Sequence, residues 1–282
     1  MTICTQIPRL FSQGVLRIKP NIVTIRSGHS TNETAHNKDD CLSQFKPLNE
    51  FKFKPVTHVI MDLDGVVLDT ANIYFRAHTR YLIKFKKRFT TEHKIHTFGV
   101  KDIDAAKYLV EHLDLPISPE VYVHGIWQEL RVNLHKAKLV DGIKNLVCHL
   151  SENSIPLALV TSSNEKALHL KLKHHMWLTK HFCHVVTADD PNVKNGKPNP
   201  DIYYKAAKKF NNSPNDFSRY LVFEDSVKGA EAATAAGMQV VMYPEKTIPR
   251  PEFEKFGFIL NSLKTIKLQD FSLPSLPEDK LY

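Results

Sequence analysis

Two aspartates, Asp62 and Asp64, stand two residues apart in the segment VIMDLDGVVLDT, directly after an apolar run that spans residues 56–61. The run is typical of a buried parallel strand, and Gly65 supplies the tight turn that such a strand needs at its end. Two carboxylates this close repel each other unless a cation joins them or one of them is protonated. The spacing therefore predicts a site that contains a positive charge.

Three further apolar runs are followed by polar side chains. The second run leads into Thr161 and Ser162, small hydrogen-bond donors at the start of a helix, which suit an anion. The loop NGKPNPD after the third run contains Lys197, and the fourth run leads into Glu224 and Asp225. Because ligands of open parallel sheets bind at the carboxyl ends of the strands, we expect all these side chains to converge on one edge of the sheet.

This set of side chains favours phosphoryl transfer. Oxygen ligands without histidine or cysteine suit a hard cation, and Mg2+ is the common choice beside phosphate. Asp62 is then the nucleophile that forms an aspartyl phosphate, and Asp64 is the acid and base for the leaving oxygen and the hydrolytic water. Thr161, Ser162 and Lys197 remain to bind the phosphoryl group. Each motif alone also fits a structural interpretation, such as a helix cap or a solvated lysine, but their joint occurrence at strand ends favours catalysis.

The order of elements along the chain predicts how these residues are positioned. Short apolar strands alternate with helices, which is typical of a parallel sheet covered by helices on both faces. The predicted strands span 56–61, 155–161, 184–187, 220–224 and 238–243, and the predicted helices span 165–176, 200–210 and 228–236. The last helix is rich in alanine and is expected to stop at Gly237. The sequence therefore predicts a doubly wound α/β core.

The interval between the first and second strands is far longer than the roughly 30 residues of a simple βαβ unit. Residues 72–138 show helical periodicity and no convincing strand, which predicts an inserted cap of about four helices. A cap over the end of the first strand would exclude water from the site. The core would then comprise residues 54–71 and 139–272, between an N-terminal extension, 1–53, and a C-terminal tail, 273–282.

Composition excludes several classes of protein. The 282 residues are 42% hydrophobic, which predicts a substantial buried core, and no window approaches the roughly 18 apolar residues of a membrane span. The four cysteines lack a metal-binding spacing and are expected to be free thiols in a reducing compartment. The net charge of +8 comes from dispersed lysines without an RNA-binding signature. We therefore expect no nucleic-acid partner, and a basic surface that attracts phosphorylated metabolites.

The start of the chain has a distinct composition. Residues 1–32 contain four basic residues and no acid, which is similar to an organelle transit peptide. Prolines and Gly14 interrupt any amphipathic helix, so a disordered extension is the preferred interpretation. A cytoplasmic location is expected, with organelle targeting by residues 1–32 as the alternative.

Four segments resemble the motifs of a known superfamily. DLDGVVLDT, LVTSSN, NGKPNPDIYYKAAKKF and LVFEDSVKGAEAATAAGM are similar to the four motifs of the haloacid dehalogenase-like hydrolases, in particular the phosphatases with a helical cap after the first motif. The resemblance covers residues 55–272 and is strongest to the pseudouridine-5′-phosphatase group.

This resemblance implies a Rossmann-like core, dependence on Mg2+, Asp62 as nucleophile and Asp64 as acid and base. It implies that Thr161 and Lys197 bind phosphate. The metal ligands that it implies are Asp62, Asp64 through its backbone carbonyl, Glu224 and Asp225.

The chain departs from the pattern of the relatives in two places. Ala71 stands where many of them have glutamate, and the neighbours of Gly99 in the cap differ. Because the cap sets the choice of substrate, the resemblance leaves the substrate open. Pseudouridine 5′-phosphate is the first expectation, and glycerol-3-phosphate or another sugar or polyol phosphate is the alternative. A phosphomutase and an inactive binding paralogue are less favoured.

Overall fold

The computed structural model describes residues 53–256 and 258–277. Its main feature is a six-stranded sheet in the order β5-β4-β1-β6-β7-β8, in which every neighbouring pair is parallel. The strands are β1 (His58–Asp62), β4 (Leu157–Thr161), β5 (His184–Thr187), β6 (Tyr220–Glu224), β7 (Gln239–Met242) and β8 (Phe258–Ile259). The predicted α/β fold is confirmed. Residues 1–52 of the predicted N-terminal extension, 1–53, lie outside the described residues, and so does the alternative targeting segment, 1–32.

The register of the central strand brings the ends of three strands level. Asp62 of β1 pairs with Val160 of β4, one residue before Thr161, and Met61 pairs with Phe223 of β6, one residue before Glu224. The last residues of β1, β4 and β6 therefore meet at one edge of the sheet.

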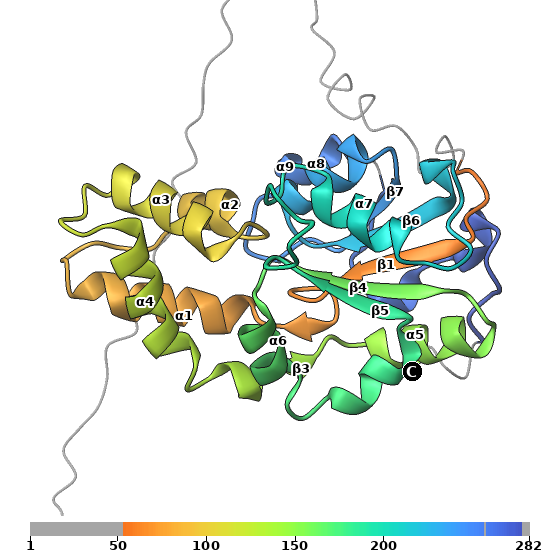
Figure 1. The fold of residues 1–282 in the computed structure, drawn as a ribbon, viewed down its shortest axis with the longest axis horizontal. Coiled ribbons are helices and arrows are strands. Elements are labelled where there is room, and N and C mark those ends of the chain that lie inside the picture. The colour runs from red at the N-terminus through yellow and green to blue at the C-terminus, as the bar shows by residue number, and fades with distance from the viewer. Residues whose placement is uncertain (1–52, 257, 278–282) are drawn as a thin grey trace, which may run out of the picture. The chain divides into compact units, whose positions relative to one another are not determined.

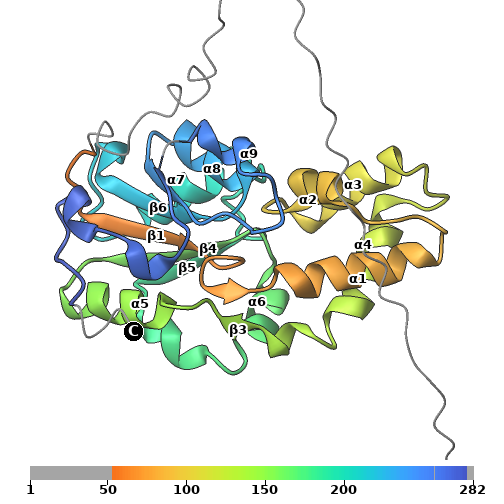
Figure 2. The same cartoon turned by 180° about the vertical axis from the view of Figure 1, so that it is seen from behind.

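Helices cover both faces of the sheet (Figures 1 and 2). Val59 and Met61 of β1 belong to the apolar core that includes the buried face of α5, whereas Ile60 belongs to the core that includes α7 and α8. This alternation follows from the period of two along a strand. The helices around the sheet are α5 (Ile143–Glu152), α6 (Glu165–Leu172), α7 (Asp201–Lys208), α8 (Val227–Ala235) and α9 (Pro251–Glu254).

Two helix ends show how local sequence sets the boundaries. The predicted helix 165–176 stops at Leu172, and a 3-10 turn follows it. The helix α8 ends as predicted, because Gly237 adopts a φ of +78° and its N–H donates to the carbonyl of Thr234. The 3-10 turns are η2 (Leu134–Lys136), η3 (Met176–His181), η4 (Phe217–Arg219), η5 (Leu263–Thr265) and η6 (Leu268–Phe271).

Four helices, α1 to α4, lie between β2 and β3 in the sequence (Figure 1). Residues of α1, α3 and α4 form one apolar core, to which Ala167 of α6 also belongs. Two short strands that pair antiparallel, β2 and β3, connect the four helices to the sheet. Helices α1 and α4 pack closely, since a Cβ at Gly125 would lie 2.1 Å from the Tyr81 ring. The elements are β2 (Leu68–Asp69), α1 (Ala71–Ile83), α2 (Thr91–Thr97), α3 (Asp102–His112), α4 (Pro119–Leu130) and β3 (Lys138–Leu139).

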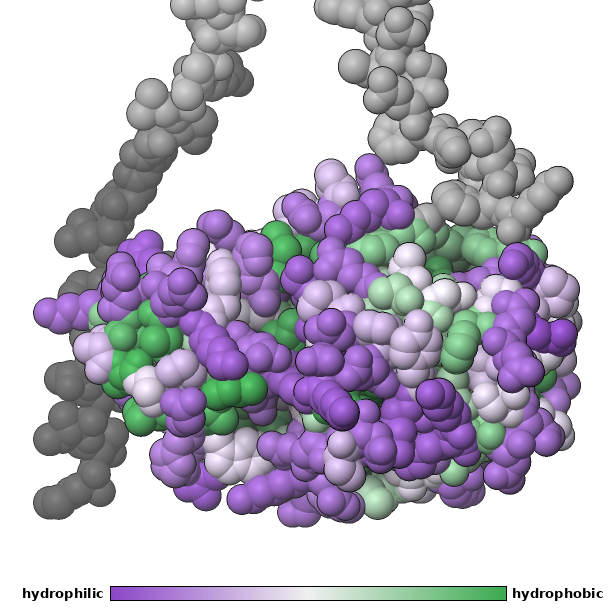
Figure 3. Space-filling model, turned by 45° about the horizontal axis from the view of Figure 1, so that its top comes forward, coloured by the Kyte–Doolittle hydropathy of each residue, from purple (hydrophilic) through white to green (hydrophobic). Residues whose placement is uncertain are grey.

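Hydrophilic side chains cover most of the face shown in Figure 3, and apolar side chains form small patches on it. Among the described residues, no helix is both long enough and apolar enough to span a bilayer. Cys148 and Cys183 are free thiols, as expected.

Candidate active site

The edge where β1, β4 and β6 end brings the predicted residues together. Asp62 ends β1 and is 3% exposed, Thr161 ends β4, and Glu224 ends β6 with Asp225 directly after it. Lys197 reaches this group from the loop after β5. Its Nζ lies 2.7 Å from Asp62 Oδ1 and also donates to Glu224 Oε1. Parallel strand ends and one buried lysine thus form the floor of the site.

Both carboxylate oxygens of Glu224 are engaged by protein donors. Oε1 accepts hydrogen bonds from Lys197 Nζ and Tyr203 Oη. Oε2 accepts from Ser226 Oγ at 3.1 Å and from the N–H groups of Asp225 and Ser226 at 3.2 and 3.3 Å. In this arrangement Glu224 orients Lys197, which differs from the metal-ligand role that the sequence resemblance implies for it.

The charge of Lys197 is secured by its neighbours. Burial alone would lower the pKa of Lys197, but the carboxylates of Asp62 and Glu224 hold that pKa well above its ordinary value. The lysine therefore presents a positive charge beside Asp62.

The site nevertheless carries surplus negative charge. Burial raises the pKa of Asp62 to about 7, against the lowering effect of Lys197 and with further raising by Glu224 and Asp64. Burial, and after it the charges of Glu224 and Asp62, raise the pKa of Asp225 well above its ordinary value. Asp225 also packs directly on the turn after β1, since a Cβ at Gly65 would lie 1.7 Å from its Oδ2.

A divalent cation would relieve this surplus, and the donor chemistry suits Mg2+. This ion is usually bound by one or two carboxylates together with waters and substrate phosphate oxygens. Asp62 accepts one backbone N–H at Oδ2, from Asp64 at 2.8 Å, and no protein donor in the described residues engages the Asp225 carboxylate. Within 53–256 and 258–277, no three acidic, histidine or cysteine side chains are arranged to hold a metal. Asp62 and Asp225 are therefore the two carboxylates in this arrangement with room for such an ion, and the predicted contribution of the Asp64 backbone carbonyl stays a prediction.

Asp64 is held by groups from three elements. Lys171 Nζ of α6 lies 2.7 Å from both of its oxygens, Thr70 Oγ1 donates to Oδ1 at 2.8 Å, and Thr161 Oγ1 donates to Oδ2 at 3.1 Å. Lys171 also donates to Ser163 Oγ at 2.6 Å and is fully buried. Sequence analysis missed Lys171. The available signal was a lysine within the buried stripe of α6, beside Leu168 and Leu172.

The hydroxyl groups predicted to bind phosphate have protein partners in this structure. Thr161 Oγ1 donates to Asp64, as described above. Ser162 Oγ donates at 2.6 Å to the carbonyl of Gly99, in the loop before α3. Lys101 Nζ donates to the carbonyl of Val193 at 3.0 Å, in the loop that leads to Lys197. These two contacts fasten the loop before α3 to the sheet edge.

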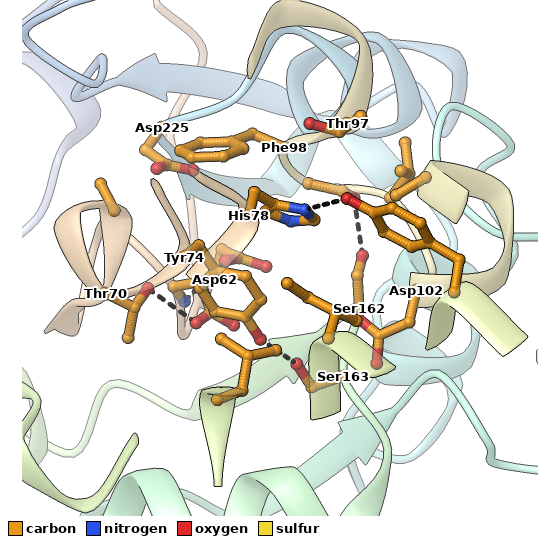
Figure 4. Close-up of a pocket in the computed structure, with 18 residues that line it drawn as sticks. Asp62, Thr70, Tyr74, His78, Thr97, Phe98, Asp102, Ser162, Ser163 and Asp225 are labelled. Carbon is orange, nitrogen blue, oxygen red and sulfur yellow. Dashed lines mark hydrogen bonds between the residues drawn. The ribbon is translucent and has the colours of Figure 1, made fainter. Parts of the chain in front are cut away.

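A cavity of about 60 Å³ lies above Asp62 and Asp64 (Figure 4). From the sheet edge, Asp62, Asp64, Ser162, Ser163 and Asp225 line it. From the inserted helices, Tyr74, His78, Phe98, Asp102 and Tyr122 line it. The cavity thus has a charged floor and a largely aromatic roof.

His78 in this roof is neutral at physiological pH. Burial, and after it the neighbouring His93, lower the pKa of His78 to about 3. Its Nδ1 is 2.9 Å from Tyr122 Oη (Figure 4). A neutral imidazole next to a phenol offers a substrate polar contacts without adding charge.

Comparison with known proteins agrees with the motifs and the geometry. The profile of the family described as haloacid dehalogenase-like hydrolase matches residues 59–243. The chain belongs to this family.

More specifically, the chain is a phosphatase of this family. It is 36% identical to the protein named "Probable pseudouridine-5′-phosphatase" of Drosophila melanogaster, over 80% of this chain and 97% of that protein. It is 35% identical to (DL)-glycerol-3-phosphatase 2 of Arabidopsis thaliana, over 78% of this chain and 92% of that protein.

Solved structures agree on the fold. The crystal structure of CbbY from Rhodobacter sphaeroides in complex with phosphate matches this structure with a TM-score of 0.65 and 19% sequence identity. The match covers 77% of this chain and 100% of the CbbY chain. At this identity the similarity is evidence for the fold, including the inserted helices, and for nothing further.

Proposed function

We propose that this phosphatase is a Mg2+-dependent phosphomonoesterase that acts through an aspartyl phosphate on Asp62. The observation that carries the proposal is the surrounding of Asp62: a buried carboxylate at a strand end, with Lys197 fixed 2.7 Å away and Asp225 beside it. A carboxylate nucleophile, a fixed cation and a second carboxylate for a metal are the parts that phosphoryl transfer requires.

The chemistry has two steps. In the first, an Asp62 oxygen attacks phosphorus, the bond from phosphorus to the ester oxygen breaks, and Asp64 gives its proton to the departing alkoxide. In the second, water attacks the same phosphorus, its proton passes to Asp64, and the bond to Asp62 breaks to release inorganic phosphate. Lys197 balances the charge of the phosphoryl oxygens throughout, and Mg2+ held by Asp62 and Asp225 would supply further positive charge there.

For the substrate we propose a small phosphorylated metabolite, with pseudouridine 5′-phosphate first. The Drosophila relative carries this activity in its name. The rings of Tyr74, Phe98 and Tyr122 in the roof of the cavity suit a planar base. Glycerol-3-phosphate, from the name of the Arabidopsis relative, is the alternative. The cavity of about 60 Å³ admits only a few water-sized groups, so either substrate enters after the inserted helices move away.

A phosphate-release assay on the full chain tests this function. The panel contains pseudouridine 5′-phosphate, uridine 5′-phosphate, glycerol-3-phosphate and glucose 1-phosphate, each with Mg2+ and with a chelator. We expect release only with Mg2+ and the highest kcat/KM for pseudouridine 5′-phosphate. Conversion of glucose 1-phosphate to glucose 6-phosphate would indicate a mutase, and no turnover of any ester would indicate a binding paralogue.

We propose a cytoplasmic location, with import into an organelle as the alternative. The relative named (DL)-glycerol-3-phosphatase 1 of Arabidopsis thaliana, 33% identical over 79% of this chain, is mitochondrial by name. The basic composition of residues 1–32 is what supports the alternative. Imaging the full chain and a chain without residues 1–32, each fused to a fluorescent protein at the C-terminus, decides between the two locations.

A further inference from the structure

Asp102 is an acidic side chain in the roof of the active-site cavity for which the two-step chemistry has no use. It is the first residue of α3 and lines the same cavity as Asp62 and Asp64 (Figure 4). In the described ranges, no protein donor forms a hydrogen bond or ion pair with its carboxylate. Burial raises its pKa, an effect that Lys171 opposes and Asp64 strengthens. A carboxylate facing other carboxylates without a partner is electrostatically unfavourable.

With the inserted helices in the position seen in this structure, contacts of the preceding residues hold Asp102 over Asp62 and Asp64. The preceding residues are fastened to the sheet edge by two hydrogen bonds, Ser162 Oγ to the Gly99 carbonyl at 2.6 Å and Lys101 Nζ to the Val193 carbonyl at 3.0 Å. There is no space for displacement toward α8, because a Cβ at Gly99 would already lie 2.1 Å from Ser226 Oγ. Asp102 is therefore held at a defined place relative to Asp62.

The usual reason for an acid at the start of a helix does not account for Asp102. An aspartate there interacts favourably with the helix dipole, but Asp104 in the same turn of α3 already provides this interaction from the protein surface. Asp104 lies 3.9 Å from Lys107 and has no place in the cavity lining. Asp102 gains no comparable interaction with the protein by facing the cavity, which leaves the substrate as the source of a partner for its carboxylate.

We propose that Asp102 is a specificity-determining residue that accepts a hydrogen bond from a hydroxyl or N–H group on the alcohol part of the substrate. Its negative charge also disfavours alcohol parts that carry a second phosphate or a carboxylate. This inference rests on the proposed function and narrows it to one substrate class: phosphate monoesters of neutral alcohols that bear hydrogen-bond donors.

The geometry divides the substrate between the two sides of the cavity. The phosphoryl group has to reach Asp62 and Lys197 on the floor, so the alcohol part points toward the roof. There Asp102 is the one carboxylate among the described residues that line the roof, which also includes the rings of Tyr74 and Phe98. Once a substrate donor has replaced water at a charged acceptor, that hydrogen bond is among the stronger kinds, and it contributes to binding in both the ground state and the transition state.

The test compares selectivity in three variants of the full chain. Asp102→Asn keeps the shape and removes the charge, Asp102→Ala removes the acceptor as well, and Asp104→Asn is the matched control on the same helix turn. Each is assayed with glycerol-3-phosphate and ribose 5-phosphate, whose alcohols carry donors, with p-nitrophenyl phosphate, whose leaving group carries none, and with fructose 1,6-bisphosphate.

We expect Asp102→Ala to lower the ratio of kcat/KM for the donor-bearing esters over the aryl ester about 10- to 100-fold, mainly through KM. Asp102→Asn should raise the relative kcat/KM for the bisphosphate about 3- to 10-fold, since a like charge is removed. Asp104→Asn should leave both ratios as in the wild type. Circular dichroism and Tm verify that the variants are folded.

Equal losses on all esters in a folded Asp102 variant would overturn the proposal, because they would show a role in holding the inserted helices rather than in selection. The same applies if Asp104→Asn shifts the ratios as much as Asp102→Asn. If the wild type releases phosphate from none of the esters, the proposed function itself fails, and this inference fails with it. Activity with unchanged ratios overturns the inference about Asp102 alone.

Discussion

The ammonium of Lys171 lies 2.7 Å from each carboxylate oxygen of Asp64. The lysine comes from α6 and is fully buried, whereas the side chain of Asp64 is 26% exposed and faces the cavity. Together with Thr70 and Thr161, Lys171 fixes the carboxylate by four hydrogen bonds. A general acid and base has to be within hydrogen-bond reach of the proton that it transfers, so we infer that Lys171 is a positioning residue for Asp64.

Lys171→Met keeps the aliphatic stem and removes the ammonium. We expect kcat for an alkyl phosphate to fall about 10- to 100-fold, within the range that general acid–base assistance contributes, while KM changes little. Steady-state kinetics on the folded variant measures this, with Lys173→Met, an exposed lysine at the C-terminal end of α6, as control. A rise in KM without a fall in kcat would contradict a positioning role.

The strand-end residues were predictable because their placement depends on local pattern and on one rule of topology. An apolar run followed by Asp62, Thr161 or Glu224 identifies a strand end, and parallel strands bring such ends to one edge. The β1 register in the structure agrees with this, with Asp62 opposite Val160. No knowledge of side-chain contacts was needed.

Lys171 and Asp102 were not predictable in the same way. Lys171 meets Asp64 across 107 positions of sequence, and Asp102 reaches the cavity only because the inserted helices pack over the sheet edge. The sequence also offered Glu224 as one more carboxylate for a metal. Its use by Lys197 and Tyr203 depends on how α7 packs on the sheet, and pattern alone does not contain that information.

Asp225→Asn tests the metal site by stability as well as by activity. With a chelator present, the variant should be at least as stable as the wild type, because the change removes a carboxylate from a cluster of like charges. With Mg2+ added, the Tm of the wild type should rise, whereas that of the variant should not, since a ligand that binds only the folded state stabilises it. Turnover should fall about 100-fold or more.

Thermal unfolding of both proteins with and without Mg2+ measures the change in Tm. A Mg2+ titration of activity measures turnover and the Mg2+ concentration at half-saturation. Asp104→Asn serves as control for loss of a carboxylate outside the site. The same Mg2+ half-saturation in Asp225→Asn and in the wild type would rule out Asp225 as a ligand.

His78 makes the stability of the fold depend on pH. The pKa of His78 is lowered from its ordinary value of 6.5 to about 3 in the folded chain because of burial, and then because of His93. A lowered folded-state pKa means that the unfolded chain binds more protons, so the stabilisation is complete above pH 6.5 and is lost as the pH falls toward 3. Between pH 7.5 and 5 the loss due to His78 should be about 2 kcal/mol.

His78→Asn keeps a polar group near Tyr122 and cannot take up a proton in this range. We expect the variant to be less stable than the wild type at pH 7.5 but to lose less stability on acidification. Chemical denaturation at both pH values measures the difference, with His112→Gln, an exposed histidine of α3, as control. Parallel losses in the wild type and in His78→Asn would show that His78 does not titrate with unfolding.

The two aspartates at the end of β1 should fail in different ways when each is replaced. Asp62→Asn removes the charged nucleophile, so no phosphoenzyme should form with any ester. Asp64→Asn keeps the nucleophile and removes the acid of the first step and the base of the second, each worth about 10²- to 10⁴-fold. An alkyl phosphate has a poor leaving group and needs the acid, so its first step should stall. An aryl phosphate hardly needs the acid, so Asp62 should still be phosphorylated while hydrolysis is slow.

Intact-protein mass spectrometry after acid quench measures the phosphoenzyme. We expect the added phosphoryl group on Asp64→Asn with the aryl ester only. Finding it on Asp62→Asn would mean that the roles of the two aspartates are reversed.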